Sequence, residues 1–375
     1  MATLIRHPVS ALGSGVSYSV TEMSFGESGP VVLIQAGLHA DECPPLLVAA
    51  RLADKLAELE AEGALRAVIR IITQANPIGG SQWLRGHHVG RFDLSSGRNF
   101  NRDMPGLASQ TMKELKRRLS DQPAYNVEAA RTLWTEALSG YVVESPVDAL
   151  QVVLQSRAVD ASWVLDLHSD DEAEPHLYAF DSSKEAACDL GQRLGASTVL
   201  LDSPSEAASF DDAVVAFWAE LDAAFPNAGF HEPVCAMTVE LRGTRDVSEP
   251  LAAHDSDALI DFLIGRGLIA GQAPEVSGDI QVHPLSGMDP VTSPDSGLLL
   301  WHTALGDEFE AGTLIAELYR PDRPNAAALG IRARVGGRLI AKRGHPWVRS
   351  GDVIAKVSGN QPLAWRTEHL LGGRR

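Results

Sequence analysis

The sequence predicts an α/β protein with a mixed, mostly parallel sheet and flanking helices, followed by a small C-terminal β-barrel or sandwich. Two observations predict this fold class. From residue 31 to residue 268, short apolar runs alternate with amphipathic stretches, as in a parallel sheet with crossover helices. Beyond residue 270 the sequence becomes rich in Gly, Pro and short β-type runs. We therefore expect two domains, residues 1–270 and residues 271–375.

The predicted elements of the first domain begin with a strand, a helix and a second strand. VVLIQAG (31–37) predicts a buried strand, and VIRIITQAN (68–76) predicts the next one. Between them, PPLLVAARLADKLAELEAEG (44–63) predicts a helix with prolines in its first turn and a glycine at its end. The remaining predictions are mainly helix over 108–159, a strand at 163–169 (WVLDLHS), a helix at 184–195, a strand at 235–243 (CAMTVELRG) and a helix at 252–268.

The predicted second domain contains an internal repeat. Residues 293–318 (SPDSGLLLWHTALGDEFEAGTLIAEL) are similar to residues 333–357 (ARVGGRLIAKRGHPWVRSGDVIAKV), and a glycine, Gly312 or Gly351, precedes the last β-type run of each. Two such units predict one pseudo-symmetric barrel or sandwich. The layout is similar to biotinyl and lipoyl carrier domains, whose modified lysine lies between the two halves. Here the intervening LYRPDRPNAAALG has no lysine, which favours a structural or lid-like role over a carrier role.

Composition and charge exclude several classes of protein. With 45% hydrophobic and 22% charged residues, the chain has the composition of a soluble globular protein. A formal net charge of −17 argues against nucleic acid or an anionic membrane as partner, because phosphate binding needs clustered Lys and Arg. Three widely separated cysteines make no disulfide framework, and no apolar run reaches the ~20 residues that a bilayer needs. We expect a cytoplasmic protein and leave homo-oligomerisation open.

Two histidines and a carboxylate follow predicted strands in a way that suits a metal. His39 and Glu42 come directly after the strand at 31–37, and His168 ends the strand at 163–169. Carboxyl ends of parallel strands are where open α/β sheets place their ligands. Two His and one carboxylate form a catalytic zinc set, although iron, cobalt or manganese use similar ligands. Asp166 lies on the same face as His168 and is a candidate to support it; an ordinary polar turn at His39 is the alternative.

A carboxylate at the end of a third predicted strand is the candidate general base. Glu240 ends CAMTVELRG, and a hydrolase that activates water with a metal needs a base to move the proton. The alternative is a plain strand-end glutamate paired with Arg242.

The predicted loop from residue 76 to residue 106 concentrates positive charge in an acidic protein. It holds Arg85, Arg91, Arg98 and Arg102. A guanidinium can bind a carboxylate with two hydrogen bonds or stabilise an oxyanion, whereas a solvated loop would carry a few arginines without any such role. His87 and His88, in the same loop, are expected at the surface because the metal set is complete without them.

These motifs, in this order, resemble those of the succinylglutamate desuccinylase and aspartoacylase family of the zinc carboxypeptidase-like clan. The similarity covers roughly residues 30–265 and rests on HADE, NPIGG, GRNFNRDMPG, DLHS and TVELRG. The C-terminal part is also similar to the segment that follows the catalytic domain in several members. The resemblance implies a zinc-dependent deacylase domain over residues 1–270.

The resemblance also implies a role for each motif residue. His39, Glu42 and His168 would bind one zinc ion, and Glu240 would be the general base and acid. Asn101 and Arg102 would hold a substrate carboxylate. Arg91 would polarise the scissile carbonyl, with Arg98 as the alternative for this role or as a further substrate-binding residue.

The expected function is hydrolysis of the amide bond of a small N-acyl amino acid or related N-acylated amine. The nearest alternative is a metallocarboxypeptidase acting on short peptides, since the same ligands and base serve both. A non-catalytic binding or carrier protein is the alternative from another class. The sequence leaves the acyl group and the amine open.

Overall fold

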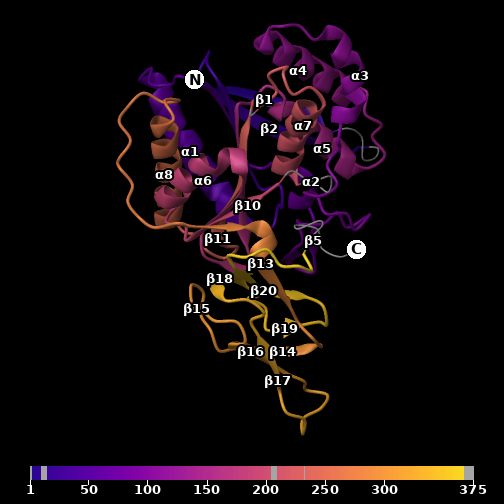
Figure 1. Ribbon diagram of the computed structural model, residues 1–375, viewed down its shortest axis with the longest axis vertical. Coiled ribbons are helices and arrows are strands. Elements are labelled where there is room, and N and C mark those ends of the chain that lie inside the picture. Colours follow the sequence, from indigo (N-terminus) through magenta and orange to yellow (C-terminus); the bar gives the residue numbers. More distant parts are fainter. Residues whose placement is uncertain (1, 10–14, 204–208, 232, 367–375) are drawn as a thin grey trace.

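The computed structural model describes residues 2–9, 15–203, 209–231 and 233–366, which form a large α/β part and a smaller all-β part (Figure 1). The centre of the α/β part is a nine-stranded sheet in the order β1-β2-β4-β3-β7-β11-β9-β10-β12. Its strands are β1 (Thr3–Val9), β2 (Tyr18–Phe25), β3 (Val31–Ala36), β4 (Val68–Ile72), β7 (Trp163–Asp170), β9 (His176–Phe180), β10 (Thr198–Asp202), β11 (Cys235–Gly243) and β12 (Gln281–Pro284).

The sheet is mixed and mostly parallel, which confirms the predicted fold class. The pairs β3·β4, β3·β7, β7·β11, β9·β10 and β10·β12 are parallel, whereas β1·β2, β2·β4 and β9·β11 are antiparallel. As a result β3, β7 and β11 all present their carboxyl ends at one edge of the sheet. The amino end of β9 lies at that edge too, because β9 runs against β11.

Helices cover both faces of the sheet, as the alternating pattern predicted (Figure 1). One layer consists of α1 (Cys43–Ala61), α6 (Lys184–Leu194) and α8 (Glu249–Gly265). The other consists of α3 (Ala108–Arg118), α4 (Pro123–Ser139), α5 (Pro146–Ala158) and α7 (Phe210–Ala224). Neighbouring strand residues enter different cores, so Ile34 packs with the first layer and Leu33 with the second. The short elements are α2 (Pro77–Gly80), β5 (Trp83–Leu84), β6 (His87–His88), β8 (Glu172–Ala173) and two 3₁₀ turns, Asp181–Ser183 and Leu285–Gly287.

The C-terminal part consists of two antiparallel sheets around a core of its own, with order β13-β20-β18-β15 and β17-β16-β14-β19. Its strands are β13 (Met288–Thr292), β14 (Gly297–Trp301), β15 (Glu308–Phe309), β16 (Leu314–Tyr319), β17 (Leu329–Arg332), β18 (Gly337–Lys342), β19 (Trp347–Val348) and β20 (Val353–Ser358). The predicted division after residue 270 stays a prediction. Strand β12, which follows that position, pairs with β10 in the large sheet.

The two parts meet near β11 (Figure 1), whose carboxyl end lies beside that of β7. Strand β8, which follows β7 in the chain, pairs with β18 of the C-terminal part. Both side-chain oxygens of Glu174, just after β8, accept hydrogen bonds from Arg338 at 2.7 and 2.8 Å. No helix in the described part of the chain combines the length and apolar character needed to cross a membrane.

Candidate metal centre and active site

The three predicted metal ligands meet at the carboxyl edge of the sheet. His39 and Glu42 lie in the turn between β3 and α1, and His168 lies near the end of the neighbouring strand β7. All three side chains are buried, and one potential ligand atom from each lies within 4.8 Å of the others. Of the described residues, this is the one group of three or more His, Cys, Asp or Glu side chains with such a spacing.

Local contacts fold the His39 turn into this position. The NPIGG motif supplies Asn76, whose Nδ2 donates to the Leu38 carbonyl at 2.9 Å while its Oδ1 accepts from the Gly79 amide at 2.7 Å. The arginine-containing loop then packs on the turn, and the Ala40 amide donates to the Gly90 carbonyl at 3.2 Å. A Cβ at Gly90 would lie 2.5 Å from the Asp41 nitrogen, so this close approach requires glycine.

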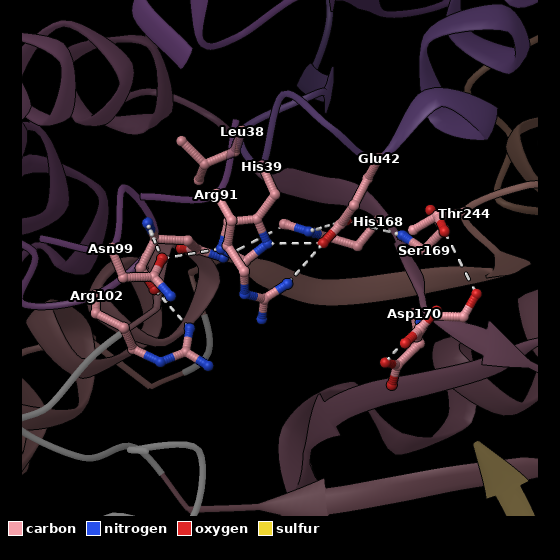
Figure 2. Close-up of polar contacts among 12 residues, drawn as sticks. Leu38, His39, Glu42, Arg91, Asn99, Arg102, His168, Ser169, Asp170 and Thr244 are labelled. Atoms are coloured by element: carbon pink, nitrogen blue, oxygen red, sulfur yellow. Dashed lines mark hydrogen bonds and ion pairs between the residues drawn. The ribbon is translucent and has the colours of Figure 1, made fainter. Parts of the chain in front are cut away.

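The Glu42 carboxylate lies between the two histidines (Figure 2). Its Oε1 lies 2.9 Å from His39 Nδ1, and its Oε2 lies 2.9 Å from His168 Nδ1. Arg91 Nη1 donates to Oε1 at 2.9 Å, and the Ser169 amide donates to Oε2 at 2.9 Å. The turn, the neighbouring strand and the loop are thus joined through one carboxylate.

The outer nitrogens of both imidazoles have acceptors of their own. His39 Nε2 lies 2.9 Å from Asn99 Oδ1, and the backbone amide of Asn101 donates to the same oxygen, which identifies it as the acceptor. His168 Nε2 lies 2.9 Å from Asp166 Oδ2. Each Nε2 therefore carries a hydrogen, which in a neutral imidazole leaves a lone pair on Nδ1.

The lone pairs on the two Nδ1 atoms and the Glu42 carboxylate then face one another. Because all three are electron-rich, they need a positive charge between them. A metal cation meets the requirement, and His or carboxylate ligands with their outer atoms held by further acceptors are usual in protein metal sites. The residues present therefore fit a divalent metal of the zinc type.

The pKa values of the three residues reflect the same need for positive charge. Burial, then the charge of Arg91, lowers the pKa of His39 to about 4. Burial alone would raise the pKa of Glu42, but His39 and His168 hold it well below its ordinary range. Burial also opposes a charged His168, yet Asp166 and Glu42 outweigh it and raise the pKa of His168 well above its ordinary value.

Glu240 lies beside this group on β11. Its register partners are His168 on β7 and His176 on β9. Among the described residues its Oε2 is buried without a hydrogen-bond partner. Burial, followed by the charges of Glu42 and Asp170, raises the pKa of Glu240 to about 7, so this carboxyl group can both accept and release a proton near neutral pH.

The alternative pairing of Glu240 with Arg242 is wrong. Arg242 lies at an irregularity of β11 with a φ of 79°, and its two terminal nitrogens donate to both oxygens of Asp255 on α8, at 2.6 and 2.7 Å. This backbone conformation directs the Arg242 side chain toward α8, whereas Glu240 lies at the edge of the sheet.

Two of the predicted arginines differ in their surroundings. Arg91 contacts Glu42, as described above. Arg98 instead donates to Asp148 Oδ1 at 2.6 Å and to Ser145 Oγ at 2.9 Å, at the beginning of α5. The substrate role predicted for Arg98 stays a prediction that these contacts do not support.

Asn101 and Arg102 lie next to the candidate metal ligands. Asn101 Oδ1 accepts from the Phe210 amide at the start of α7 at 2.7 Å, and its Nδ2 lies 3.4 Å from His168 Nε2. Arg102 Nη1 donates to the Asn101 carbonyl, and burial followed by the charge of Arg91 lowers the pKa of Arg102. The predicted role of this pair in substrate binding also stays a prediction.

Some neighbours of the site were not predicted. Asn99 was missed. Asn99 and Asn101 are separated by one residue in RNFN, and this spacing is a signal that both face the histidines from one side of the segment. Tyr178 and Lys356 were missed as well, since neither belongs to a motif. His87 is exposed, and His88 stacks on the exposed Trp83 with ring centroids 4.8 Å apart, in line with their expected place at the surface.

Several known proteins are similar to this chain over most of its length. The N-alpha-acetyl-L-2,4-diaminobutyric acid deacetylase of Halomonas elongata is 26% identical over 361 residues, which are 94% of this chain and 89% of the relative. A crystal structure from Shewanella frigidimarina, described as succinylglutamate desuccinylase/aspartoacylase, has a TM-score of 0.83 and 24% identity over 96% of this chain and 97% of the other.

A second structural relative is the ectoine utilization protein EutE (DoeB) of Ruegeria pomeroyi. Its product-bound structure has a TM-score of 0.68 and 18% identity, and it covers 96% of this chain and 95% of the other. At these identities the two structures establish the fold. A sequence model of the Succinylglutamate desuccinylase/Aspartoacylase catalytic domain matches residues 28–264, well over half of the chain. The chain therefore belongs to the succinylglutamate desuccinylase/aspartoacylase family, whose members are amidohydrolases that remove acyl groups from N-acyl amino acids.

Proposed function

We propose that this protein binds one zinc ion per chain and hydrolyses the amide bond of a small N-acyl amino acid. One observation carries the proposal. Nδ1 of His39, the Glu42 carboxylate and Nδ1 of His168 converge directly beside Glu240, whose Oε2 is buried without a partner among the described residues. A metallohydrolase needs residues that bind the metal and, beside them, a group that accepts and releases protons near neutral pH. A carboxyl group with a pKa of about 7 meets the second requirement.

His39, Glu42 and His168 would hold the zinc ion. Bound there, zinc supplies a Lewis acid that polarises the amide carbonyl and makes water more acidic. The surrounding acceptors, Asn99 and Asp166, keep both imidazoles in the tautomer that presents Nδ1.

The remaining steps belong to side chains of this protein. Glu240 Oε2 takes the proton of the attacking water and delivers it to the departing amine nitrogen, for which a pKa near neutral pH is suited. The Arg91 guanidinium, already aimed at the metal set through Glu42, donates to the oxyanion that forms on the carbonyl oxygen. Arg102 and Asn101 bind the substrate carboxylate.

The substrate class follows from the family and from the relative in Halomonas elongata, a deacetylase of N-acetylated 2,4-diaminobutyric acid. We propose N-acetylated short amino acids, diamino acids included, as the first substrates to test. The placement of the C-terminal strands close to the carboxyl edge of the sheet supports a small substrate over a long peptide (Figure 1).

The variant Glu240→Gln tests the mechanism. It keeps the shape of the side chain and removes the base, so kcat should fall by about 100-fold or more, while elemental mass spectrometry still finds one zinc per chain. Glu114→Gln, at an ion pair on α3, is the matched control and should keep full turnover. Full turnover by Glu240→Gln with zinc bound would exclude Glu240 as the base.

Two further measurements test the metal and the substrate. His168→Ala should lose the zinc, and zinc retained at one per chain in that variant would exclude His168 as a ligand. Acetyl, succinyl and formyl amino acids should be assayed beside short peptides. Faster cleavage of the peptides would replace the proposal by a metallocarboxypeptidase.

A further inference from the structure

A lysine from the C-terminal part reaches the sheet edge that carries Glu240. Lys356 lies on β20, and its Nζ lies 2.5 Å from Asp170 Oδ2. The same nitrogen donates to the Tyr178 hydroxyl at 3.0 Å. One side chain thus joins the end of β7 to the middle of β9 in the large sheet, although it lies 178 residues from Tyr178 in the chain.

Glu240 lies between the two strands that Lys356 joins. Strand β11 pairs with β7 on one side and with β9 on the other, and Glu240 is in register with His168 and His176. Asp170 and Tyr178 each follow these partners by two residues, so strand alternation places them on the same face of the sheet as Glu240. Because β9 runs against β11, Tyr178 pairs with Thr238, before Glu240 along β11, whereas Asp170 pairs with Gly243, after it. Lys356 therefore bridges two polar side chains that flank the proposed base on the two neighbouring strands.

The charge of Lys356 matters at this place because the neighbouring carboxylates are crowded. Asp170 and Glu42 both raise the pKa of Glu240 after burial, whereas Lys356 and His168 lower it. The Asp170 carboxylate is held by Lys356 and, through Oδ1, by the Asp171 amide at 2.9 Å. Without the ammonium group, Asp170 would be a carboxylate with little compensation beside Glu240, and such groups move toward water or toward another donor.

A second lysine of the C-terminal part offers a comparison. Lys342 on β18 also forms an ion pair with the α/β part, with Nζ 3.8 Å from Oε2 of Glu172 on β8, and it lies over the Trp301 ring at 5.5 Å. The contacts described for it involve neither Asp170 nor Tyr178. Both lysines therefore tie the same two parts of the chain together, but only Lys356 does so at the proposed base.

We propose that Lys356 is a positioning residue for the reaction, which holds the Asp170 carboxylate and the Tyr178 hydroxyl in place around Glu240 and makes the C-terminal part a component of the active site. The inference rests on the proposed function only in taking Glu240 as the base. The geometry around Lys356 does not depend on that role.

The experiment compares Lys356→Met with Lys342→Met in the full-length protein. Hydrogen exchange of residues 169–180 is measured with and without zinc, and kcat and KM are measured on an N-acetyl amino acid. Lys356→Met should speed exchange of this segment and lower kcat by about 100-fold, the effect of misplacing a reacting group by about 1 Å. Its KM should stay close to the wild-type value, and its zinc content should stay at one per chain. Lys342→Met should match the wild type in all four quantities.

Two milder variants keep the test decisive if Lys356→Met does not fold. Tyr178→Phe removes only the hydroxyl that Lys356 binds and should lower kcat by about tenfold, or about 1.4 kcal/mol in activation free energy. Lys356→Arg keeps the charge, so its kcat should lie closer to the wild-type value than that of Lys356→Met wherever Lys356→Met folds. If Tyr178→Phe turns over at the wild-type rate, the inference is overturned.

Each remaining result decides between the two proposals. Unchanged exchange in Lys356→Met, or equal losses in Lys356→Met and Lys342→Met, would overturn the positioning role. Faster exchange in Lys356→Met alone, in a protein whose wild type hydrolyses none of the N-acyl substrates, would support the positioning role and overturn the proposed function.

Discussion

Substitutions of Asp166 are expected to weaken metal binding in two graded steps. Asp166 is fully buried; its Oδ2 lies 2.9 Å from His168 Nε2, and its Oδ1 accepts from Gln35 Nε2 at 3.0 Å. The carboxylate therefore sets the tautomer of His168 and makes its Nδ1 a better ligand. Residues in this supporting position typically change metal affinity by about 10- to 100-fold.

The contacts of Asp166 indicate which substitution should lose about tenfold and which about 100-fold in metal affinity. In Asp166→Asn the oxygen of the new amide can still accept a hydrogen bond from His168. Its NH₂ group then faces Gln35, whose Oε1 has no partner among the described residues. A rotated Gln35 amide can therefore accept from this NH₂ group. Only the charge is lost, so we expect a loss of about tenfold in affinity, or about 1.4 kcal/mol. Asp166→Ala leaves two buried donors without acceptors, so we expect about 100-fold, or about 2.7 kcal/mol.

Competition for zinc with a chromophoric chelator measures both affinities directly. Asp160→Asn is the control, because Asp160 forms a two-point ion pair with Arg70 at 2.7 Å in another part of the sheet. Its zinc affinity should equal that of the wild type. Equal zinc affinity in Asp166→Ala and the wild type would refute the assignment of His168 as a ligand supported by Asp166.

Three further predictions concern stability and the arginines. Trp134 is 1% exposed and stacked in the core, so Trp134→Ala should lower the free energy of unfolding in urea by about 3–5 kcal/mol; Trp347→Ala, at a side chain that is 47% exposed, should change it by about 0.5 kcal/mol or less. Burial alone would raise the pKa of Asp148, but the hydrogen bonds from Arg98 and Ser145 and the charge of Arg98 together outweigh it and lower this pKa below its ordinary value of 3.8. The resulting stabilisation is fully present above pH 3.8 and is lost as the pH falls through the lowered pKa. The melting temperatures of the wild type and Asp148→Asn should therefore differ at neutral pH and converge as the pH falls below 3.8; a constant difference would contradict the shift. Arg91→Met should lower kcat by about 100-fold, whereas Arg98→Met should leave kcat near the wild-type value, and the reverse order in steady-state assays would exchange their roles.

The metal-binding set was predictable because it depends on short stretches of sequence. HADE and DLHS each follow a strand that its apolar run identifies, and parallel strands bring their carboxyl ends to one edge whatever lies between them. The same reasoning brought Glu240 to His168, its register partner. The functions assigned to these residues remain predictions for the experiments above.

Arginine roles were harder to predict because they depend on side-chain partners rather than on strand ends. The loop between residues 76 and 106 is long, and the sequence left both Arg91 and Arg98 as candidates for the carbonyl. The structure places Arg98 against Asp148 of α5 and Ser145, the residue that caps this helix, and it places Arg91 beside Glu42.

By itself, the sequence determined the fold class, the order of the main strands and helices, the family and the three residues that can hold a metal, because periodicity and strand-end motifs are local properties. Only the tertiary structure decided what surrounds them. The strands β9 and β10 were not predicted from their short runs, and β9 places His176 opposite Glu240 and Tyr178 opposite Thr238. Lys356 reaches the same place from a strand of the C-terminal part. Contacts between residues this far apart depend on how the two parts of the chain pack, and no local pattern in the sequence records that packing.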